Sequence, residues 1–322
     1  MNSLLVKGVF QILLAFNIPI IALGQVAIGT DDLLFDQESF TDSLSVLYPV
    51  DEWAAETPWG PGEHLVYQVK VGIFNAGEGH MTVEALDSIR GHQTYRAVMG
   101  IKGGLPGLRV DDSYTTWMDV QTLQTWRYIR EIDEPFYESY RHYEFYPDRG
   151  FWHRTDNDES GPLASSLPLD DIAFIYFIRR LPLEVGKTYS FSRYFKEEGN
   201  PVVIQVLRQD EYETEGVKYS TIVVKPIVQT DGLFGQGGEA ELHFTDDDRR
   251  ILVYMKSNIP MFPGSLTLHL RSIQEGVPLN PDSRNTAIEG RLTSPSMSPT
   301  GITSFIRIED FGIAQIMMNP DR

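Results

Sequence analysis

The stretch that most constrains the fold is 168–189, which reads PLDDIAFIYFIRRLPLEVGKTY. Asp170 is a favourable N-cap, because its carboxylate can accept backbone N–H groups at the positive end of the helix dipole. Pro182 disfavours the helical conformation for Leu181, so the helix should end there. These signals predict one helix over about 171–180, roughly 15 Å long.

The predicted helix has almost no polar face. Its apolar side chains point in nearly every direction around the helix axis: Ile172, Ala173, Phe174, Ile175, Phe177 and Ile178. A helix that is apolar all round is buried. One buried helix without helical neighbours needs a large sheet around or beneath it.

Short alternating segments, rich in aromatic and β-branched residues, lie on both sides of this helix in the sequence. Before it they cover 65–71, 80–86, 95–101, 109–118, 123–132, 137–146 and 151–154. After it they cover 188–195, 201–208, 217–228, 239–244, 251–256 and 265–273. Turn residues separate them, for example at 75–77 and 103–107, and no βαβ rhythm appears. We predict an all-β fold: an antiparallel sheet, strongly curved or barrel-like, with the helix buried between two strand blocks.

The charge balance and the cysteine count exclude several classes of function. The 322 residues carry a formal net charge of −18, which disfavours nucleic acid and anionic lipid headgroups as partners. The chain has no cysteine. Disulfides, thiolate catalysis and a lipidated N-terminal cysteine are therefore excluded, and stability must come from burial alone.

Segment 1–24 has the features of a secretory signal peptide. Lys7 supplies the positive region, 9–23 is mostly apolar, and Ala22 and Gly24 are small residues at the positions before a cleavage site. The alternative is an uncleaved membrane anchor, but Asn17 and Pro19 interrupt a stretch that is short for a membrane span. We expect export to the periplasm or outer envelope of a Gram-negative-type bacterium, with no integral membrane segment after cleavage.

Composition divides the rest of the chain into three parts. Segment 25–57 is an acidic extension without Lys or Arg. A solvated extension is favoured over a calcium site for this segment. Segment 58–275 is the predicted β domain. Segment 276–322 is a Pro/Ser/Thr-rich linker followed by a C-terminal segment that is apolar enough to dock on the domain.

No combination of residues points to catalysis or metal binding. None of the seven histidines has metal-ligand spacing. His142 and Glu144 share a strand face and are the best acid/base candidates, although a solvent-facing polar row is the commoner arrangement. The run 246–248 is better explained as a hairpin turn than as a calcium loop. Asp111 and Asp112 should point to opposite faces of a strand. We predict no catalytic residue, no metal and no cofactor.

Aromatic and arginine side chains give the remaining functional signal. Trp126, Tyr128 and Arg130 alternate along one predicted strand, and Arg141 and Tyr143 alternate along the next. Facing one another, these five side chains would line a pocket for a ligand with apolar and anionic parts. Ordinary core packing with cross-strand pairing is the alternative.

Three stretches resemble a family of exported bacterial proteins catalogued as domain of unknown function 3108. Segment 58–67, PWGPGEHLVY, is similar to the family's opening GE-x-L-x-Y strand, and 76–79 to the small-residue turn that follows it. Segment 170–179 is similar to its D-x-x-S-x-x-Y-x-x-R helix, with Ala173 where Ser is common, and 183–187 follows as the family pattern expects. Segment 247–252 is similar to its D-x-x-R-x-P hairpin, with Leu252 where Pro is usual.

The resemblance covers about 58–273 and implies a leader peptide, a curved all-β fold and a place in the cell envelope. It implies no known activity and no functional residues. Taken together, we expect a non-catalytic binder of a lipid or another amphipathic small molecule. The alternative is an assembly partner of other envelope proteins, and a hydrolase-type enzyme using His142 and Glu144 is the third hypothesis.

Overall fold

The computed structural model describes residues 57–105, 107–135, 137–228, 240–258 and 265–279. The predicted signal peptide, nearly all of the acidic extension and most of the segment after 276 lie outside the described residues. Among the described residues, no helix is long and apolar enough to cross a membrane.

The described residues form fourteen strands, one α-helix and two short 3-10 helices. The strands before the helix are β1 (His64–Val71), β2 (Phe74–Ile89), β3 (His92–Leu105), β4 (Leu108–Asp119), β5 (Thr125–Glu134), β6 (Tyr137–Tyr146), β7 (Phe151–Arg154) and β8 (Ser160–Pro162). The helix is α2 (Asp171–Arg179). The strands after it are β9 (Thr188–Phe191), β10 (Val202–Thr214), β11 (Val217–Ile227), β12 (Ala240–Thr245), β13 (Leu252–Asn258) and β14 (Ser265–Gln274). The 3-10 helices are η3 (Pro147–Arg149) and η4 (Glu197–Gly199).

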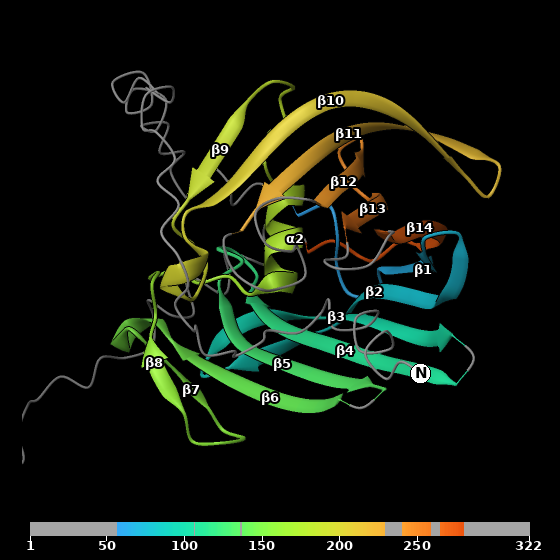
Figure 1. The fold of residues 1–322 in the computed structure, drawn as a ribbon. Helices are drawn as coiled ribbons and strands as arrows, with labels where there is room; N and C mark the ends of the chain where they lie inside the picture. Colours follow the sequence, from blue (N-terminus) through green and yellow to red (C-terminus); the bar gives the residue numbers. More distant parts are fainter. Residues whose placement is uncertain (1–56, 106, 136, 229–239, 259–264, 280–322) are drawn as a thin grey trace, which may run out of the picture.

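All fourteen strands belong to one antiparallel sheet, in the order β8-β7-β6-β5-β4-β3-β2-β1-β14-β13-β12-β11-β10-β9. Consecutive strands are neighbours in the sheet, except for β8 and β9, which flank α2 in the sequence and form the two edges of the sheet. The pairing of β1 with β14 joins the two strand blocks. Figure 1 shows the sheet curving around α2, with β2–β8 on one side of the helix and β9–β12 on the other. The all-β, strongly curved fold is therefore confirmed, and the described sheet is not closed into a barrel.

The sheet ends on two short edge strands. β8 has three residues and ends in Pro162, and β9 has four. Short edges of this kind, with proline, resist pairing with further strands. The chain between β8 and α2 bonds to the segment that follows β9, because the backbone N–H of Ala164 donates to Phe195 and that of Leu169 donates to Arg193.

One predicted turn is wrong. The chain turns at Gly72 and Ile73, and 75–77 lies within β2, because Val71 pairs with Phe74. Gly77 also pairs with Gly103 of β3 at very close range. A Cβ atom on Gly77 would lie 2.3 Å from the carbonyl oxygen of Lys102. These glycines therefore allow close contact between two strands, and neither forms the turn that glycine usually indicates.

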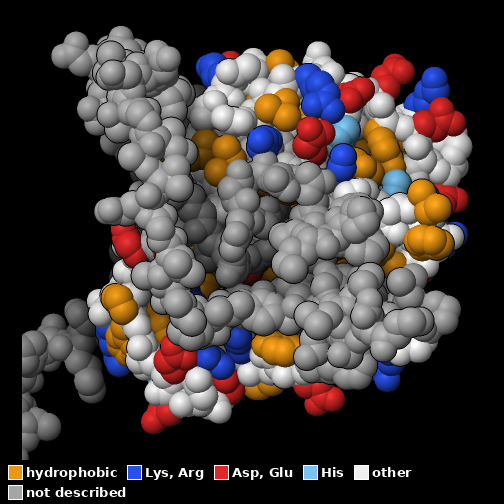
Figure 2. Space-filling model, viewed as in Figure 1, with side chains coloured by type: hydrophobic (Ala, Val, Ile, Leu, Met, Phe, Trp, Pro, Cys, Tyr) orange, Lys and Arg blue, Asp and Glu red, His pale blue; other side chains and the backbone are white. Residues whose placement is uncertain are grey.

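The helix is buried at every position, as its all-round apolar sequence predicts. Its residues belong to one large hydrophobic cluster with the inward-facing side chains of the sheet, including those of β1, β3, β10 and β12. A second, small cluster contains Ile89, Trp117 and Trp126. Figure 2 shows acidic and basic side chains interspersed on the described part of the surface. Arg208 forms ion pairs with Asp210 and Glu241.

Candidate functional site

The start of α2 is fixed by Asp170. This side chain is fully buried, and one of its carboxylate oxygens accepts the backbone N–H groups of Ile172 and Ala173 at 2.8 and 3.0 Å. Its other oxygen accepts the hydroxyls of Thr116 on β4 and Thr125 on β5. Burial raises the pKa of Asp170 to about 6, against the opposing effect of these hydrogen bonds. Four donors therefore satisfy a buried carboxylate, which is a structural role.

The end of α2 is fixed by Arg179. Its two terminal nitrogens donate to the two carboxylate oxygens of Glu63, at 2.7 and 2.8 Å, and both side chains are buried. The guanidinium carbon lies 4.7 Å from the centre of the Trp59 ring and 5.4 Å from that of Tyr176. The same side chain also donates to the backbone oxygen of Arg249, at 3.1 Å. The C-terminal end of the helix is thus joined to both strand blocks.

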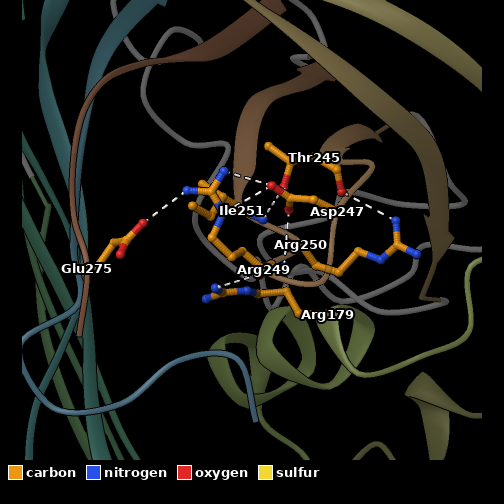
Figure 3. A network of polar contacts seen from close by, with 7 residues as sticks. All are labelled: Arg179, Thr245, Asp247, Arg249, Arg250, Ile251 and Glu275. Atoms are coloured by element: carbon orange, nitrogen blue, oxygen red, sulfur yellow. Dashed lines mark hydrogen bonds and ion pairs between the residues drawn. The ribbon is translucent and has the colours of Figure 1, made fainter. Parts of the chain in front are cut away.

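The β12–β13 turn is an Asp-centred hairpin, as the sequence predicts for 246–248. Asp247 accepts the hydroxyl of Thr245 at 2.6 Å and the backbone N–H and guanidinium of Arg249. Arg249 also pairs with Glu275 at 3.0 Å. Figure 3 shows Arg179 of α2 reaching this turn from the helix. Asp247 thus binds its own neighbouring cation, as expected of a hairpin turn rather than a calcium loop.

The three stretches that carry the family resemblance meet around Arg179. Glu63 comes from the first stretch, Arg179 from the helix, and Arg249 from the late hairpin. Tyr67 of the first stretch also donates to the backbone oxygen of Leu252 in the third, at 2.9 Å. The motifs thus hold the helix and the two strand blocks together, which fits their interpretation as structural elements.

Two of the five predicted ligand residues are packed tightly in the core. Tyr128 and Tyr143 pair across β5 and β6, and their ring centres lie 6.2 Å apart. Tyr143 also contacts the rings of Trp152 and Phe195, and Tyr128 donates to Asp171 at 3.3 Å. This is the cross-strand pairing that the alternative interpretation of these residues describes.

Arg130 and Arg141 lie two residue pairs further along the same two strands, and so on the same face as Tyr128 and Tyr143. They are directly opposite each other in the β5–β6 register. Arg130 is buried and its guanidinium lies over the Tyr114 ring, 5.5 Å from the ring centre. Arg141 is half-buried. The structure therefore brings together Tyr128, Arg130, Arg141 and Tyr143 on the inner side of the sheet.

Trp126 does not share this face, and the prediction that it does is wrong. The β4–β5 register shifts here, because Met118 pairs with Thr125 and Trp117 pairs with Arg127, which leaves Trp126 without an opposite residue. A bulge of this kind turns the residues that follow it to the other face. Trp126 packs with Trp117 in the small cluster and stacks on His92, with ring centres 3.8 Å apart.

A buried carboxyl pair lies on the inner side of β4 and β5, close to Arg130. Asp112 and Glu134 are 2% and 5% exposed. Burial raises the pKa of Asp112 to about 6. Burial, followed by the negative charge of Asp112, raises the pKa of Glu134 to about 8, and a proton shared with Asp112 adds to this effect. Near neutral pH the pair therefore holds about one proton and one negative charge.

Two polar atoms in this region receive no hydrogen bond from any N–H or O–H group of the described residues, apart from the proton that the two acids share. They are Oδ2 of Asp112 and the hydroxyl of Tyr114, which is 2% exposed. The other oxygen of Asp112 accepts only the backbone N–H of Asp133, at 3.1 Å. Asp112, Tyr114, Arg130 and Glu134 form what we call the inner polar site. It differs from the Asp170 region because two of its acceptors, Oδ2 of Asp112 and the Tyr114 hydroxyl, have no fixed donor among the described residues.

The inner polar site was missed at the sequence level, although a signal was present. Val110, Asp112 and Tyr114 alternate along β4, so a polar residue occupies an inward position. The prediction that Asp111 and Asp112 face opposite ways is confirmed, because Asp111 pairs with the exposed side chains of Lys102 and Arg109. Because Asp112 alternates with Val110 and Tyr114, its inward position could have been predicted from the sequence.

The best catalytic candidates of the sequence do share a face. Nε2 of His142 lies 3.0 Å from Glu144, but Arg90 and Arg127 also bind this carboxylate. Burial acts to raise the pKa of Glu144, and the hydrogen bonds from both arginines outweigh it and lower the pKa. A carboxylate held in this way is a weak proton acceptor. The described residues contain no group of three His, Asp or Glu side chains placed to hold a metal ion.

A family model matches most of the folded part of the chain. The family is described as "Protein of unknown function (DUF3108)", and the match covers residues 66–271. The chain belongs to the DUF3108 family. The resemblance inferred from the three sequence stretches is thereby confirmed, and the match extends from β1 into β14.

No curated protein matches this DUF3108 chain. Among solved structures, it is similar to a β-barrel-like protein of domain of unknown function DUF1849 from Brucella abortus, with 10% identity, coverage of 67% of this chain and 98% of that one, and a TM-score of 0.43. It is also similar to a candidate lipoprotein from Parabacteroides distasonis, with 7% identity, coverage of 68% and 99%, and a TM-score of 0.31. At these identities and TM-scores, neither likeness says anything about function.

Proposed function

We propose that this DUF3108 protein is a non-catalytic binder of an amphipathic small molecule, acting in the cell envelope. The ligand lies on the inner side of the curved sheet, with its polar end at Asp112, Tyr114, Arg130 and Glu134. Arg141, Tyr128 and Tyr143 border this position. Trp126, which lies on the other face, is not part of it.

The observation that carries the proposal is a pair of buried polar atoms, Oδ2 of Asp112 and the hydroxyl of Tyr114, to which the described residues offer no donor except the proton that Asp112 shares with Glu134. A buried polar atom without a partner costs about 1–3 kcal/mol, and such groups in native proteins call for an explanation. A bound polar group supplies that explanation. The inward-facing neighbours Ile101, Val110 and Ile132 are apolar and buried, which suits the rest of an amphipathic molecule.

Envelope localisation rests on segment 1–24, which has the pattern of a signal peptide. For a protein in that compartment, lipids and their breakdown products are the abundant amphipathic molecules. The proposal therefore joins a location to a ligand class and gives no enzymatic role to the outer-face pair of His142 and Glu144.

Native mass spectrometry tests this function. The mature chain from Gln25 is purified gently from the envelope fraction of its own host, and we expect a discrete added mass that disappears in organic solvent. The double variant Asp112→Asn, Tyr114→Phe should lose that mass. Asp111→Asn is the matched control, because it changes the adjacent residue on the exposed face. A bare mass for the wild-type chain would overturn the proposal.

A second candidate function, contact with another envelope protein, is favoured by one observation. The β1–β2 turn carries Ile73 and Phe74, which are 88% and 59% exposed. Adjacent large apolar side chains at a hairpin tip often contact a partner. The same purification tests this function, because a protein that co-purifies with the wild type and is lost in Ile73→Ser, Phe74→Ser would support it.

A further inference from the structure

We infer that the polar end of the ligand is a hydrogen-bond donor, best a protonated amine, held between Asp112 and Glu134. This inference rests on the proposed function and deepens it by naming the chemistry of the ligand. It reverses one part of the sequence-based expectation, which used the arginines to predict an anionic ligand group.

The open oxygen of Asp112 limits which ligand groups can bind to it. Oδ2 of Asp112 is a carboxylate oxygen, which can only accept a hydrogen bond while the group is ionised. Its partner must therefore be an N–H or O–H group. A charged donor forms a bond about twice as strong as a neutral one. The hydroxyl of Tyr114 can rotate to accept from, or donate to, the same ligand group.

The two buried acids favour a cation over an anion. Asp112 and Glu134 are buried and close enough for the charge of one to affect the other. In the free protein a shared proton relieves their repulsion. A cation between the two carboxyl groups takes the place of that proton and allows both to ionise. An anionic ligand group at the same place would add a further negative charge.

The positive charge of Arg130, taken alone, would favour an anionic ligand group. Its guanidinium already lies over the Tyr114 ring and interacts electrostatically with Asp171 of α2. Asp171 is itself buried and accepts from Tyr128 and Tyr194. Arg130 also acts on Asp112 and Glu134, where its charge opposes the effect of burial on their pKa values. One arginine therefore faces three buried carboxyl groups, those of Asp112, Glu134 and Asp171, so the site remains acidic in balance.

Several charged or titratable groups surround the pair and take part in any response to pH: Asp111, Tyr114, Tyr128, Arg130, Asp133, Arg141 and Asp171. The carboxyls with raised pKa values, which are Asp112, Glu134 and Asp171, are all buried. Asp111 faces outward, and its hydrogen bond from Arg109 lowers its pKa. Raising the pH from 6 to 8 should therefore act mainly by removing protons from Asp112 and Glu134.

The test uses three probes with the same twelve-carbon chain: dodecylamine, dodecanol and dodecanoate, each below its micelle concentration. Binding to the full mature chain is measured by titration calorimetry. We expect dodecylamine to bind at least tenfold more tightly than dodecanoate, and more tightly at pH 8 than at pH 6. We also expect proton release on binding, detected as a different heat in two buffers of unequal ionisation enthalpy.

Variants connect the preference to the site. Asp112→Asn and Glu134→Gln should each reduce the advantage of the amine at least fivefold, and Asp111→Asn should keep it. Circular dichroism checks that each variant is folded, and Tyr114→Phe provides a second, milder change at the same site. If dodecanoate binds as well as dodecylamine, or if Asp112→Asn keeps the preference, the inference is overturned and the binding function stands. If none of the three probes binds, the binding function fails with it.

Discussion

Asp170 and Asp112 are two buried aspartates on the inner side of the same curved sheet, and their surroundings are opposite. Asp170 accepts four hydrogen bonds, two from the backbone of α2 and two from threonine hydroxyls. Asp112 accepts one from a fixed donor, the backbone N–H of Asp133, and its other oxygen is unfilled. Burial raises the pKa of each to about 6.

The comparison shows that burial and a raised pKa do not distinguish a carboxylate with all its acceptors occupied from one with an open acceptor. A perturbed pKa marks a functional candidate only as a probability, because structural networks perturb pKa values too. The count of filled acceptors makes the distinction here. Around α2 the polar groups bind to the protein itself, as Arg179 does to Glu63, whereas in the inner polar site Oδ2 of Asp112 and the hydroxyl of Tyr114 have no fixed partner among the described residues.

The largest loss of stability is expected near α2, where the polar groups are bound to the protein itself. Arg179→Met leaves Glu63 as a buried, unpaired carboxylate and removes the bond to the β12–β13 turn. Breaking one partner of a buried pair costs about 3–5 kcal/mol, so the urea midpoint should fall sharply. Lys187→Met is the control, because its pair with Glu184 is exposed and should contribute less than about 1 kcal/mol. Equal effects of the two variants would contradict the structural role of Arg179.

The second prediction applies one substitution to both aspartates. Asp170→Ala removes the N-cap of α2 and leaves the buried hydroxyls of Thr116 and Thr125 without their acceptor. The loss should lower the unfolding free energy by about 2–4 kcal/mol. Asp112→Ala loses one backbone acceptor but relieves a buried charge beside Glu134, so its cost should stay within about 1 kcal/mol.

Chemical denaturation of the two alanine variants in the same buffer measures the difference. We expect Asp170→Ala to be less stable than Asp112→Ala by about 2 kcal/mol, because only the first substitution removes a helix cap and leaves two hydroxyls without an acceptor. A reversed order would mean that the inner polar site is the one that holds the fold together, and the binding proposal would lose its basis.

Much of this architecture was predictable because its signals are local. The cap at Asp170, the apolar helix and the period-two alternation of the strands each depend on a few adjacent residues, and each was predicted correctly. The Asp247 turn follows from acidic residues next to their own arginines.

The parts that sequence reasoning missed depend on contacts between distant segments or on small shifts of register. One extra residue in β5 moved Trp126 to the outer face, and alternation alone contains no sign of that shift. Nothing in the local sequence indicates that Arg179 meets Glu63, which is 116 positions away in the chain. The proximity of Asp112 to Glu134 required the pairing of β4 with β5 to be known.

The last prediction concerns pH and the unfilled side of the comparison. The pKa of Glu134 is about 8 in the folded protein, against an ordinary value near 4.5, so between these values the folded chain holds a proton that the unfolded chain has lost. Stability must then fall as the pH rises through this window, by up to about 1.4 kcal/mol per unit. Three histidines with lowered pKa values, His80, His243 and His269, oppose this fall by up to about 0.4 kcal/mol each above pH 6.5, because the unfolded chain still loses their protons there. We therefore expect the unfolding free energy, measured by urea denaturation, to fall by about 1–2 kcal/mol between pH 6.5 and pH 8.

Two substitutions on β5 assign this slope to one carboxyl. Glu134→Gln should flatten the slope, because it removes the group that titrates, and Glu131→Gln on the exposed face of the same strand should keep it. A wild-type slope that survives in Glu134→Gln would show that this carboxyl is ionised throughout. The two-acid site would then not hold the shared proton on which its preference for a cation depends.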